Sequence, residues 1–309
     1  MSEIVFIDGR FCPRQRAKIS VFDHGLLYGD GVFEGIRLYG GCIFRLEAHL
    51  ERLFASAKYL ALKMPLTVEE FRWVTVETCR RNGLKDGYIR LVVTRGEGDL
   101  GLAPWICKRP SVICIAGKIA LYPPEAYTQG LKIVTVPTRR TSVSTLNPRV
   151  KSCNYLNNIL AKIEGHNAGT VEALMLDDRG CVIECTGDNI FIVKDEVLYT
   201  PPTYRGALKG ITRDCIIEIA KDLGYTVKEE PFTRFEIFDA DECFMTGTAA
   251  EVVPVVNLDA RPIARGRPGP ITKALNRAFR EMVSHDGARL DERLPRPRRI
   301  SRIWAAGRR

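Results

Sequence analysis

Residues 171–185 read VEALMLDDRGCVIEC, and this stretch distinguishes between the fold classes open to the chain. Two mostly apolar runs, 171–176 and 181–185, flank the turn-forming residues of 177–180, as in an antiparallel hairpin. A third apolar run follows at 190–193. Strands this closely spaced predict an antiparallel arrangement. The stretch therefore favours an α+β fold over a doubly wound parallel sheet.

Helices and further strands are predicted on both sides of this hairpin. Residues 46–62 carry apolar residues at helical spacing. The other expected helices are 67–82, 154–166, 214–223 and 270–283, and the other expected strands are 3–8, 88–94, 111–116, 131–136 and 252–256. Pro123 and Pro124 interrupt the pattern, which places a domain boundary there. The sequence thus predicts a small N-terminal domain (1–121) and a larger second domain (122–286).

The charge of the chain is concentrated at its C-terminal end. The 309 residues include 46 Lys and Arg against 37 Asp and Glu, for a formal net charge of +9. Residues 287–309 hold eight arginines against two acids, which gives 8 − 2 = +6 for this segment alone. A segment rich in Arg and Pro predicts a basic, disordered tail. Binding of a nucleic acid or an anionic surface is the alternative role for it.

Composition excludes several protein classes. With 45% hydrophobic residues the chain is not disordered as a whole, and it has no apolar run long enough for a membrane-spanning helix. Ten cysteines form no C-x-x-C pair and four histidines are scattered, so no metal site is expected. The first residues lack the features of a signal peptide, and free thiols fit a reducing cytoplasm. We therefore expect a cytoplasmic protein without a nucleic-acid or membrane partner.

Three charged residues could carry chemistry. Lys151 directly precedes the helix expected at 154–166, where an amine can be held and partly desolvated as a nucleophile, although it can equally be a surface lysine. Glu184 lies in an apolar strand, so it either faces solvent or is paired. Arg52 has no carboxylate three or four residues away on its helix, so its guanidinium is either solvated or able to grip a phosphate.

Two glycine-containing stretches could bind anions. Gly210-Ile211-Thr212 precedes the helix expected at 214–223 and offers free backbone N–H groups, although Thr212 could instead be a plain N-cap. Residues 247–250 are small and could present N–H groups to a carboxylate, or simply connect two strands tightly. An amine, an acid and several anion binders are the components of a pyridoxal phosphate site. Their spacing alone does not establish one.

Seven motifs in a fixed order carry a family resemblance across residues 3–283. They are Tyr28 to Arg37, Arg45 to Arg52, Tyr88-Ile89-Arg90, Lys151 to Tyr155, Glu184 with Gly187 to Phe191, Gly210 to Arg213, and Gly247 to Glu251. The sequence resembles the class IV (fold type IV) pyridoxal-phosphate aminotransferases, and among them the branched-chain amino acid aminotransferases most. The resemblance implies the two-domain α+β fold of D-amino-acid aminotransferase and the cofactor pyridoxal 5′-phosphate.

The resemblance also implies which residues hold this cofactor. Lys151 would bond covalently to the cofactor and carry the proton of the reaction. Glu184 would pair with the pyridine nitrogen and keep it protonated, so that the ring acts as an electron sink. Tyr155 would donate to the phenolic oxygen. The expected phosphate-binding residues are Arg52, Gly210, Ile211, Thr212 and Thr248.

For the substrates, the resemblance implies a ping-pong reaction between L-leucine, L-isoleucine or L-valine and 2-oxoglutarate. Arg90 would take the distal carboxylate of glutamate. The apolar walls would be Tyr28, Phe33 and Tyr155, and the α-carboxylate would bind Tyr88 and the amides of Thr248 and Ala249, with Gly35 and Gly247 also in the substrate site. Leu100 and Leu102 match a loop that lines the pocket of a neighbouring subunit, which implies a homodimer or larger homo-oligomer.

Two other functions stay open. Residues 93–96 also resemble the D-amino-acid aminotransferases and the aminodeoxychorismate lyases of the same fold, whereas Tyr88, Arg90 and residues 247–249 favour the branched-chain enzymes. The second alternative is a non-catalytic binding protein whose basic tail contacts RNA or a membrane. Detection of bound pyridoxal phosphate separates this alternative from the enzyme.

Overall fold

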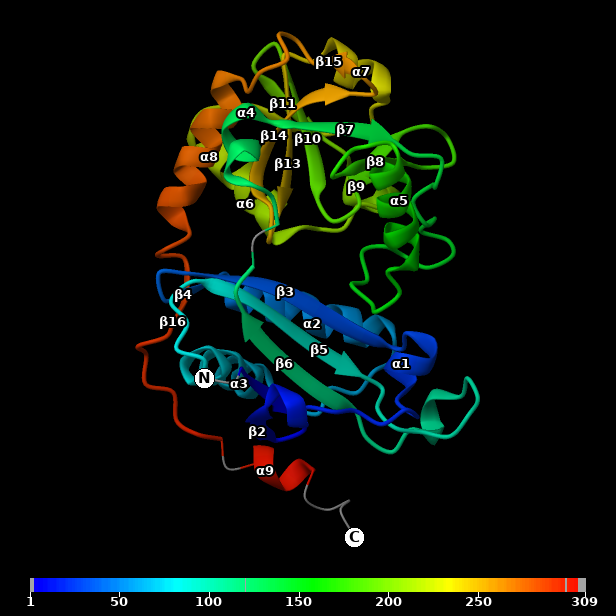
Figure 1. Ribbon diagram of the computed structural model, residues 1–309, viewed down its shortest axis with the longest axis vertical. Helices are drawn as coiled ribbons and strands as arrows, with labels where there is room; N and C mark the ends of the chain where they lie inside the picture. Colours follow the sequence, from blue (N-terminus) through cyan, green and yellow to red (C-terminus); the bar gives the residue numbers. More distant parts are fainter. Residues whose placement is uncertain (1–2, 120, 298, 305–309) are drawn as a thin grey trace. The chain divides into compact units, whose positions relative to one another are not determined.

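A computed structural model describes residues 3–119, 121–297 and 299–304 of the chain. The chain divides into two compact units (Figure 1). Unit 1 comprises residues 1–119, 150–154 and 283–309, and unit 2 comprises residues 120–149 and 155–282. Each unit has its own hydrophobic core.

Unit 1 is built on an antiparallel sheet with the strand order β16-β4-β3-β5-β6-β1-β2. Its strands are β1 (Ile4–Ile7), β2 (Arg10–Pro13), β3 (Gly31–Tyr39), β4 (Cys42–Phe44), β5 (Gly87–Thr94), β6 (Ser111–Gly117) and β16 (Gly287–Arg289). The turn at Asp8 and Gly9 joins β1 to β2. The central pair β3–β5 runs in register from Gly31 opposite Thr94 to Leu38 opposite Gly87.

Two long helices cover this sheet. The helical segments of unit 1 are η1 (Arg14–Arg16), α1 (His24–Tyr28), α2 (Leu46–Tyr59), α3 (Val68–Arg81), η2 (Pro104–Ile106) and α9 (Ile300–Ile303). Figure 1 shows α2 beside β3, while α3 packs on β1 and β6. Thr67 begins α3 with a capping box that includes Glu70, because each side chain binds the other's backbone N–H. Both predicted helices of the N-terminal half are confirmed.

Unit 2 contains a mixed sheet with the order β12-β11-β10-β13-β14-β7-β8-β9, and β15 pairs with β14. Its strands are β7 (Leu131–Thr135), β8 (Ala173–Leu176), β9 (Val182–Cys185), β10 (Asn189–Lys194), β11 (Val197–Thr200), β12 (Val227–Glu229), β13 (Glu242–Gly247), β14 (Glu251–Leu258) and β15 (Arg261–Pro262). The predicted hairpin is confirmed, since β8 and β9 pair antiparallel with Leu174 opposite Cys185. However, β7 runs parallel to both β8 and β14.

Helices flank the sheet of unit 2. They are α4 (Pro124–Gln129), α5 (Leu156–Asn167), η3 (Thr203–Arg205), α6 (Ile211–Asp222), α7 (Arg234–Asp239) and α8 (Pro270–Met282). α6 and α8 pack on each other and on β13, and α5 packs on β8. The apolar residues Leu156, Ile159, Leu160 and Ile163 of α5 are exposed. Within the described ranges, no helix combines the length and the apolar character that crossing a membrane requires.

The observed division differs from the predicted one around Lys151. Residues 150–154 lie in the second half of the sequence but belong to unit 1. The Phe33 N–H donates to the Lys151 carbonyl (3.0 Å), and the Cys153 N–H donates to the Gly31 carbonyl (2.8 Å). Backbone pairing to β3 therefore determines where this segment belongs, and hydrophobic patterning gives no sign of it.

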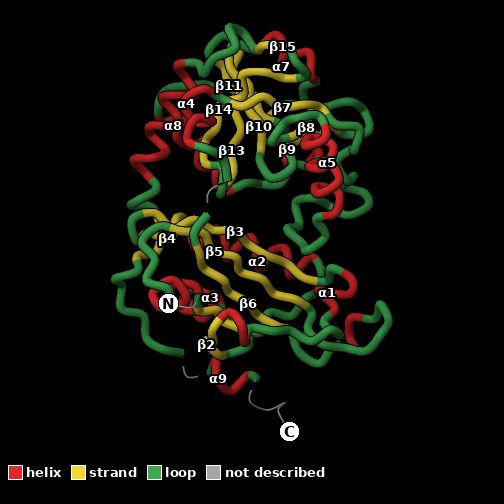
Figure 2. The backbone as a smooth tube through the Cα atoms, viewed as in Figure 1, coloured by secondary structure: helices red, strands yellow, loops and turns green. Residues whose placement is uncertain are grey.

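The C-terminal segment also differs from the predicted disordered tail, because its described part is packed on unit 1. β16 adds an edge strand to β4, and Figure 2 shows the following residues as a loop that leads towards α9. Arg299 pairs with Glu70 (3.0 Å), and the Trp304 indole donates to the Pro110 carbonyl (3.3 Å). Long-range ion pairs and buried apolar side chains thus hold a segment whose composition suggested solvation. Arg298, Arg308 and Arg309 lie outside the described residues.

We predict that Trp304→Ala lowers the free energy of unfolding by about 1–3 kcal/mol, because the indole is buried (3% exposed) against unit 1. Trp105→Ala is the matched control, since Trp105 is 83% exposed and its loss should cost less than about 0.5 kcal/mol. Urea unfolding followed by circular dichroism measures both. Equal stability of Trp304→Ala and the parent chain would contradict the packed position of this segment.

Candidate active site

Lys151 stands beside the aromatic ring of Phe33 on β3. Its Nζ atom lies 4.7 Å from the centroid of this ring, and the Cζ atom of Arg90 lies 4.4 Å from the same centroid. The Lys151 N–H also donates to Ser56 Oγ on α2 (3.2 Å). Unit 1 therefore brings three predicted site residues together, with the basic side chains of Lys151 and Arg90 close to the ring of Phe33.

Tyr88 and Gly35 join this group through the β3–β5 pair. Gly35 lies opposite Arg90 in the register, and the Arg90 guanidinium donates to the Tyr88 hydroxyl (3.3 Å). A Cβ atom on residue 35 would lie only 1.9 Å from this hydroxyl. Only glycine leaves room for the tyrosine there, so the Gly35–Tyr88 contact fixes the position of a hydroxyl next to a guanidinium.

Arg52 faces the same region from α2, but it is paired. Its Nε and one terminal nitrogen donate to the two carboxylate oxygens of Glu34 at 2.8 and 2.7 Å. Glu34 is fully buried on β3 and also contacts His49 Nδ1 at 2.7 Å. No carboxylate lies three or four residues from Arg52 along its own helix, whereas Glu34 comes from a strand. Glu34 and His49 are thus further residues of the candidate site that helix spacing does not reveal, although both lie within the family motifs.

Burial and neighbouring charges shift the pKa values of Glu34 and His49 in the Glu34–Arg52–His49 cluster. Burial alone would raise the pKa of Glu34, but the charge and hydrogen bonds of Arg52, together with the hydrogen bond to His49, lower it to about 2. Burial lowers the pKa of His49 despite the neighbouring carboxylate, and the charges of Arg52 and Lys151 lower it further. A neutral His49 donates from Nδ1 to the ionised Glu34. Its buried Nε2 then carries a lone pair, with no partner in the described part of the chain.

Tyr28, Leu100 and Leu102 form a separate group in unit 1. The Tyr28 hydroxyl accepts a hydrogen bond from the Gly101 N–H (3.0 Å), which places it against the loop that contains both leucines. Leu100 and Leu102 are 72% and 80% exposed. Large apolar side chains this exposed on a loop are typical of a surface that another molecule covers.

Glu184 is the predicted acid of unit 2, and it is buried and paired. Its carboxylate accepts hydrogen bonds from Arg140 Nε (2.7 Å), the Leu208 N–H (2.8 Å) and Asn189 Nδ2 (3.4 Å). The solvent-facing interpretation of Glu184 is therefore wrong. Arg140 and Asn189 are further residues of the site, and nothing in the spacing of the sequence marks Arg140.

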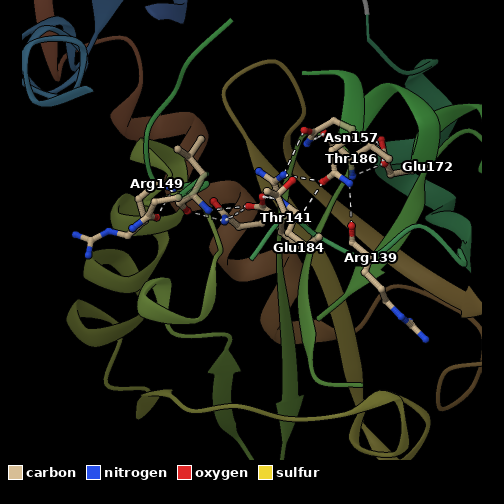
Figure 3. Close-up of polar contacts among 12 residues, drawn as sticks. Arg139, Thr141, Arg149, Asn157, Glu172, Glu184 and Thr186 are labelled. Carbon is tan, nitrogen blue, oxygen red and sulfur yellow. Dashed lines mark hydrogen bonds and ion pairs between the residues drawn. The ribbon is translucent and has the colours of Figure 1, made fainter. Parts of the chain in front are cut away.

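A wider polar network extends from Glu184 (Figure 3). Arg140 also donates to Asn157 Oδ1 (3.0 Å), and Asn157 accepts a second hydrogen bond from the Thr141 N–H. Figure 3 also shows Thr186 next to Glu172, whose carboxylate accepts from the Thr186 N–H (2.8 Å). These contacts fix the Arg140 side chain and with it the Glu184 carboxylate.

The residues of the anion site predicted for unit 2, 210–212, lie at the start of α6. Gly210, and not Thr212, is the N-cap residue, so Ile211 and Thr212 lie in the first turn. The first backbone N–H groups of a helix have no partner within the helix. A Cβ atom on residue 210 would lie 2.1 Å from Asn189 Oδ1. Gly210 therefore lets the helix begin directly against a neighbour of Glu184.

The remaining predicted residues of unit 2 lie at a strand-to-strand turn and at the start of a helix. Gly247 ends β13 opposite Glu251 of β14, so residues 248–250 form the connecting turn. Thr248 and Ala249 are partly exposed at this turn. Tyr155 is the N-cap residue of α5 and is also partly exposed. Both places can present groups to a ligand.

Comparison with known proteins assigns the chain to a family. The model of the amino-transferase class IV family matches residues 31–258. The chain belongs to the class IV aminotransferases. A Methanocaldococcus jannaschii protein, provisionally named a branched-chain-amino-acid aminotransferase, is 53% identical over 93% of this chain and 98% of its own length.

Solved structures agree with this assignment. The branched-chain amino acid aminotransferase of Escherichia coli superposes with a TM-score of 0.89 at 35% identity, covering 93% of this chain and 97% of its own. The T.th. branched-chain amino acid aminotransferase with pyridoxamine 5′-phosphate gives 0.88 at 40% identity, covering 92% and 95%. The predicted fold type IV architecture and the pyridoxal 5′-phosphate cofactor are thereby confirmed, and the chain is a pyridoxal-phosphate-dependent aminotransferase.

The residues of this aminotransferase suit the cofactor. Glu184 accepts three hydrogen bonds, whereas a carboxylate has about four acceptor sites, so one remains for a pyridinium N–H. The first turn of α6 suits a phosphate group, since backbone N–H groups and the helix dipole both favour an anion there. Lys151 supplies the primary amine.

We predict that Glu34→Gln destabilises the protein by about 3 kcal/mol at pH 7, because it removes the buried carboxylate that pairs with Arg52. The pKa of Glu34 is lower in the folded protein than its ordinary 4.5. Its stabilisation is therefore complete above about pH 4.5 and is lost as the pH falls towards about 2. The difference between parent and variant should shrink over that range in urea unfolding.

Glu47→Gln serves as the control for this prediction. Glu47 also pairs with an arginine, Arg72 (2.9 Å), but at the surface, so its loss should cost less than about 1 kcal/mol at every pH. Equal effects of the two substitutions at pH 7 would contradict the importance of the buried pair.

Proposed function

We propose that this aminotransferase transfers the amino group of L-leucine, L-isoleucine or L-valine to 2-oxoglutarate. The observation that carries the proposal is the grouping of Tyr88 and Arg90 with Phe33 and Lys151, which combines carboxylate-binding groups with an aromatic wall beside the amine. Two structures of the T.th. enzyme support this proposal for both substrate classes. One is a complex with N-(5′-phosphopyridoxyl)-L-glutamate, and the other is a complex with 4-methylvaleric acid.

Lys151 is the catalytic residue of the proposed reaction. Bound pyridoxal phosphate supplies an electron sink for the electron pair left when the substrate Cα loses its proton. The Lys151 amine would hold the cofactor covalently until the substrate amine displaces it, and the released Lys151 amine would then take the proton from the substrate Cα. The backbone pairing of residues 151 and 153 with β3 holds this amine beside Phe33 while the proton moves.

The other proposed cofactor contacts involve residues of both units. Glu184 accepts a hydrogen bond from the pyridine nitrogen, and its own bonds from Arg140 and the Leu208 N–H hold the carboxylate still. Tyr155 donates to the phenolic oxygen. The phosphate is bound by Arg52 and by the chain at Gly210, Ile211, Thr212 and Thr248.

The proposed substrate site separates two carboxylates. Tyr88 and the Thr248 and Ala249 N–H groups bind the α-carboxylate that both substrates carry. Arg90 binds the distal carboxylate of 2-oxoglutarate, because a planar guanidinium matches a carboxylate with two donors. Gly35 and Gly247 keep space for these groups, and Tyr28 with Phe33 provides the apolar surface for a branched side chain.

We also propose that the enzyme is a homodimer or larger homo-oligomer. Leu100 and Leu102 are exposed on one loop of unit 1. Unit 2 exposes a second apolar surface, formed by Leu156, Ile159, Leu160 and Ile163 of α5. A second copy of the chain would bury these surfaces, as large apolar patches on soluble proteins generally mark interfaces.

We predict that the enzyme with 2-oxoglutarate consumes L-leucine, L-isoleucine and L-valine and forms glutamate. Coupled assay of glutamate and of the 2-oxo acids measures the reaction. Lys151→Ala should abolish turnover and leave the circular dichroism spectrum unchanged, whereas Lys58→Ala, which removes an exposed amine on α2, should keep full rate. Turnover of D-alanine without L-leucine would instead favour a D-amino-acid aminotransferase.

We predict that Glu184→Gln keeps the cofactor but lowers the rate of each half-reaction by roughly 10²-fold or more, because an amide does not balance the charge of a protonated ring. Stopped-flow absorbance with L-leucine and with 2-oxoglutarate measures the two half-reactions. The control is Glu229→Gln, which removes a carboxylate bound to Arg213 and should leave both rates unchanged. A near-normal rate for Glu184→Gln would show that another group supports the ring nitrogen.

A further inference from the structure

Unit 2 buries a carboxyl group that the proposed reaction does not use. Asp188 lies in the turn between β9 and β10, where its carbonyl accepts from the Cys185 N–H (2.8 Å). The Tyr122 hydroxyl lies 3.1 Å from Asp188 Oδ2 and 3.1 Å from Glu172 Oε2. All three side chains are buried. One hydroxyl therefore stands between two carboxyl groups away from solvent.

The shared hydroxyl favours a protonated form of one of these carboxyl groups. A tyrosine hydroxyl has a single hydrogen and can donate to only one of the two oxygens. If both carboxyl groups were ionised, one of the two 3.1 Å contacts between the Tyr122 oxygen and a carboxylate oxygen would contain no hydrogen. The two negative charges would also repel each other. A second hydrogen must therefore lie in this chain of three groups.

We assign the proton to Asp188, because Glu172 already accepts several hydrogen bonds and is therefore stabilised as a carboxylate. Glu172 accepts from Lys162 Nζ (2.7 Å), the Ala173 N–H (2.9 Å), and the N–H and hydroxyl of Thr186. Asp188 then donates to the Tyr122 oxygen, and Tyr122 donates to Glu172. Burial, followed by the charge of Glu172, raises the pKa of Asp188 to about 7, although Tyr122 and Lys162 act in the opposite direction.

The other oxygen of Asp188 lies against the turn assigned to the substrate. A Cβ atom on Gly247 would lie 1.8 Å from Asp188 Oδ1, so the carboxyl group is in direct contact with Gly247, the last residue of β13 before this turn. A neutral acid here leaves the neighbouring N–H groups free to attract an anion. An ionised acid would place a negative charge beside the position proposed for the α-carboxylate.

We propose that Asp188 is a positioning residue that must stay protonated for the turn at 247–249 to bind the α-carboxylate of either substrate. This inference rests on the proposed function, because it takes that turn to be the carboxylate site. The titratable and charged groups that face Asp188 are Tyr122, Lys162, Glu172, Glu184 and Cys185. Burial raises the pKa values of Tyr122 and of the Cys185 thiol, so neither becomes charged near neutral pH.

The pH dependence of KM tests the proposal. In the holoenzyme, KM for L-leucine and KM for 2-oxoglutarate should both rise roughly tenfold as the pH increases through about 7, with little change in kcat. Asp188→Asn should keep the low KM values at every pH, because an amide still donates to Tyr122 and cannot ionise. Asp178→Asn, in the exposed turn after β8, is the matched control and should follow the parent enzyme.

Three outcomes would overturn the proposal. The first is a pH profile of KM in Asp188→Asn that equals the profile of the parent. The second is a KM that rises with pH for only one of the two substrates, and the third is a pH-dependent decrease confined to kcat. Infrared spectroscopy gives a second measurement: the parent should show a protonated carboxyl band that disappears above about pH 7 and is absent in Asp188→Asn. Its absence from the parent would refute the neutral acid. Failure of the proposed function would appear separately, as no turnover of L-leucine by the parent at any pH.

Discussion

Two backbone hydrogen bonds tie residues 151 and 153 to β3, and the surroundings of the reactive amine depend on them. A lysine side chain is long and flexible, so its Nζ is positioned only if its own backbone is fixed. Pairing with Gly31 and Phe33 makes Lys151 an extension of the sheet of unit 1. Glu34 lies on β3, and Arg90 lies on β5, the strand that pairs with β3. The amine, the aromatic ring and the guanidinium are thus held by one ladder of hydrogen bonds.

The two units handle buried charge differently. In unit 1, Glu34 is ionised because Arg52 meets both of its oxygens, and His49 donates to it as a neutral ring. In unit 2, Asp188 has no cation in direct contact among the described residues and shares hydrogens through Tyr122 instead. Glu172 takes the only lysine contact described in that cluster. A buried carboxylate paired with a cation keeps its charge over a wide pH range, whereas a buried carboxyl group without such a partner has its pKa raised towards neutrality.

Features that depend on near neighbours in the chain could be predicted from the sequence, and features that depend on distant partners could not. Helical periodicity located α2 and α3, and turn residues located the β8–β9 hairpin. The partners of Arg52, Glu184 and Arg299 come from other elements, and no local pattern reveals them. The family motifs predicted the chemistry of Lys151 and Glu184. They gave no indication that residues 150–154 complete the sheet region of unit 1, because that is a matter of tertiary backbone pairing.

The late position of the edge strand β16 in the chain affects the order in which the two units can be completed during synthesis. Most of unit 1 precedes unit 2 along the chain, yet its sheet is completed by residues 287–289 and its core by Ile300 and Trp304. Nearly all of unit 2 lies between these two portions. A nascent chain can therefore finish unit 2 while unit 1 still exposes the edge of β4, and unit 1 becomes complete only after its C-terminal portion has been synthesised.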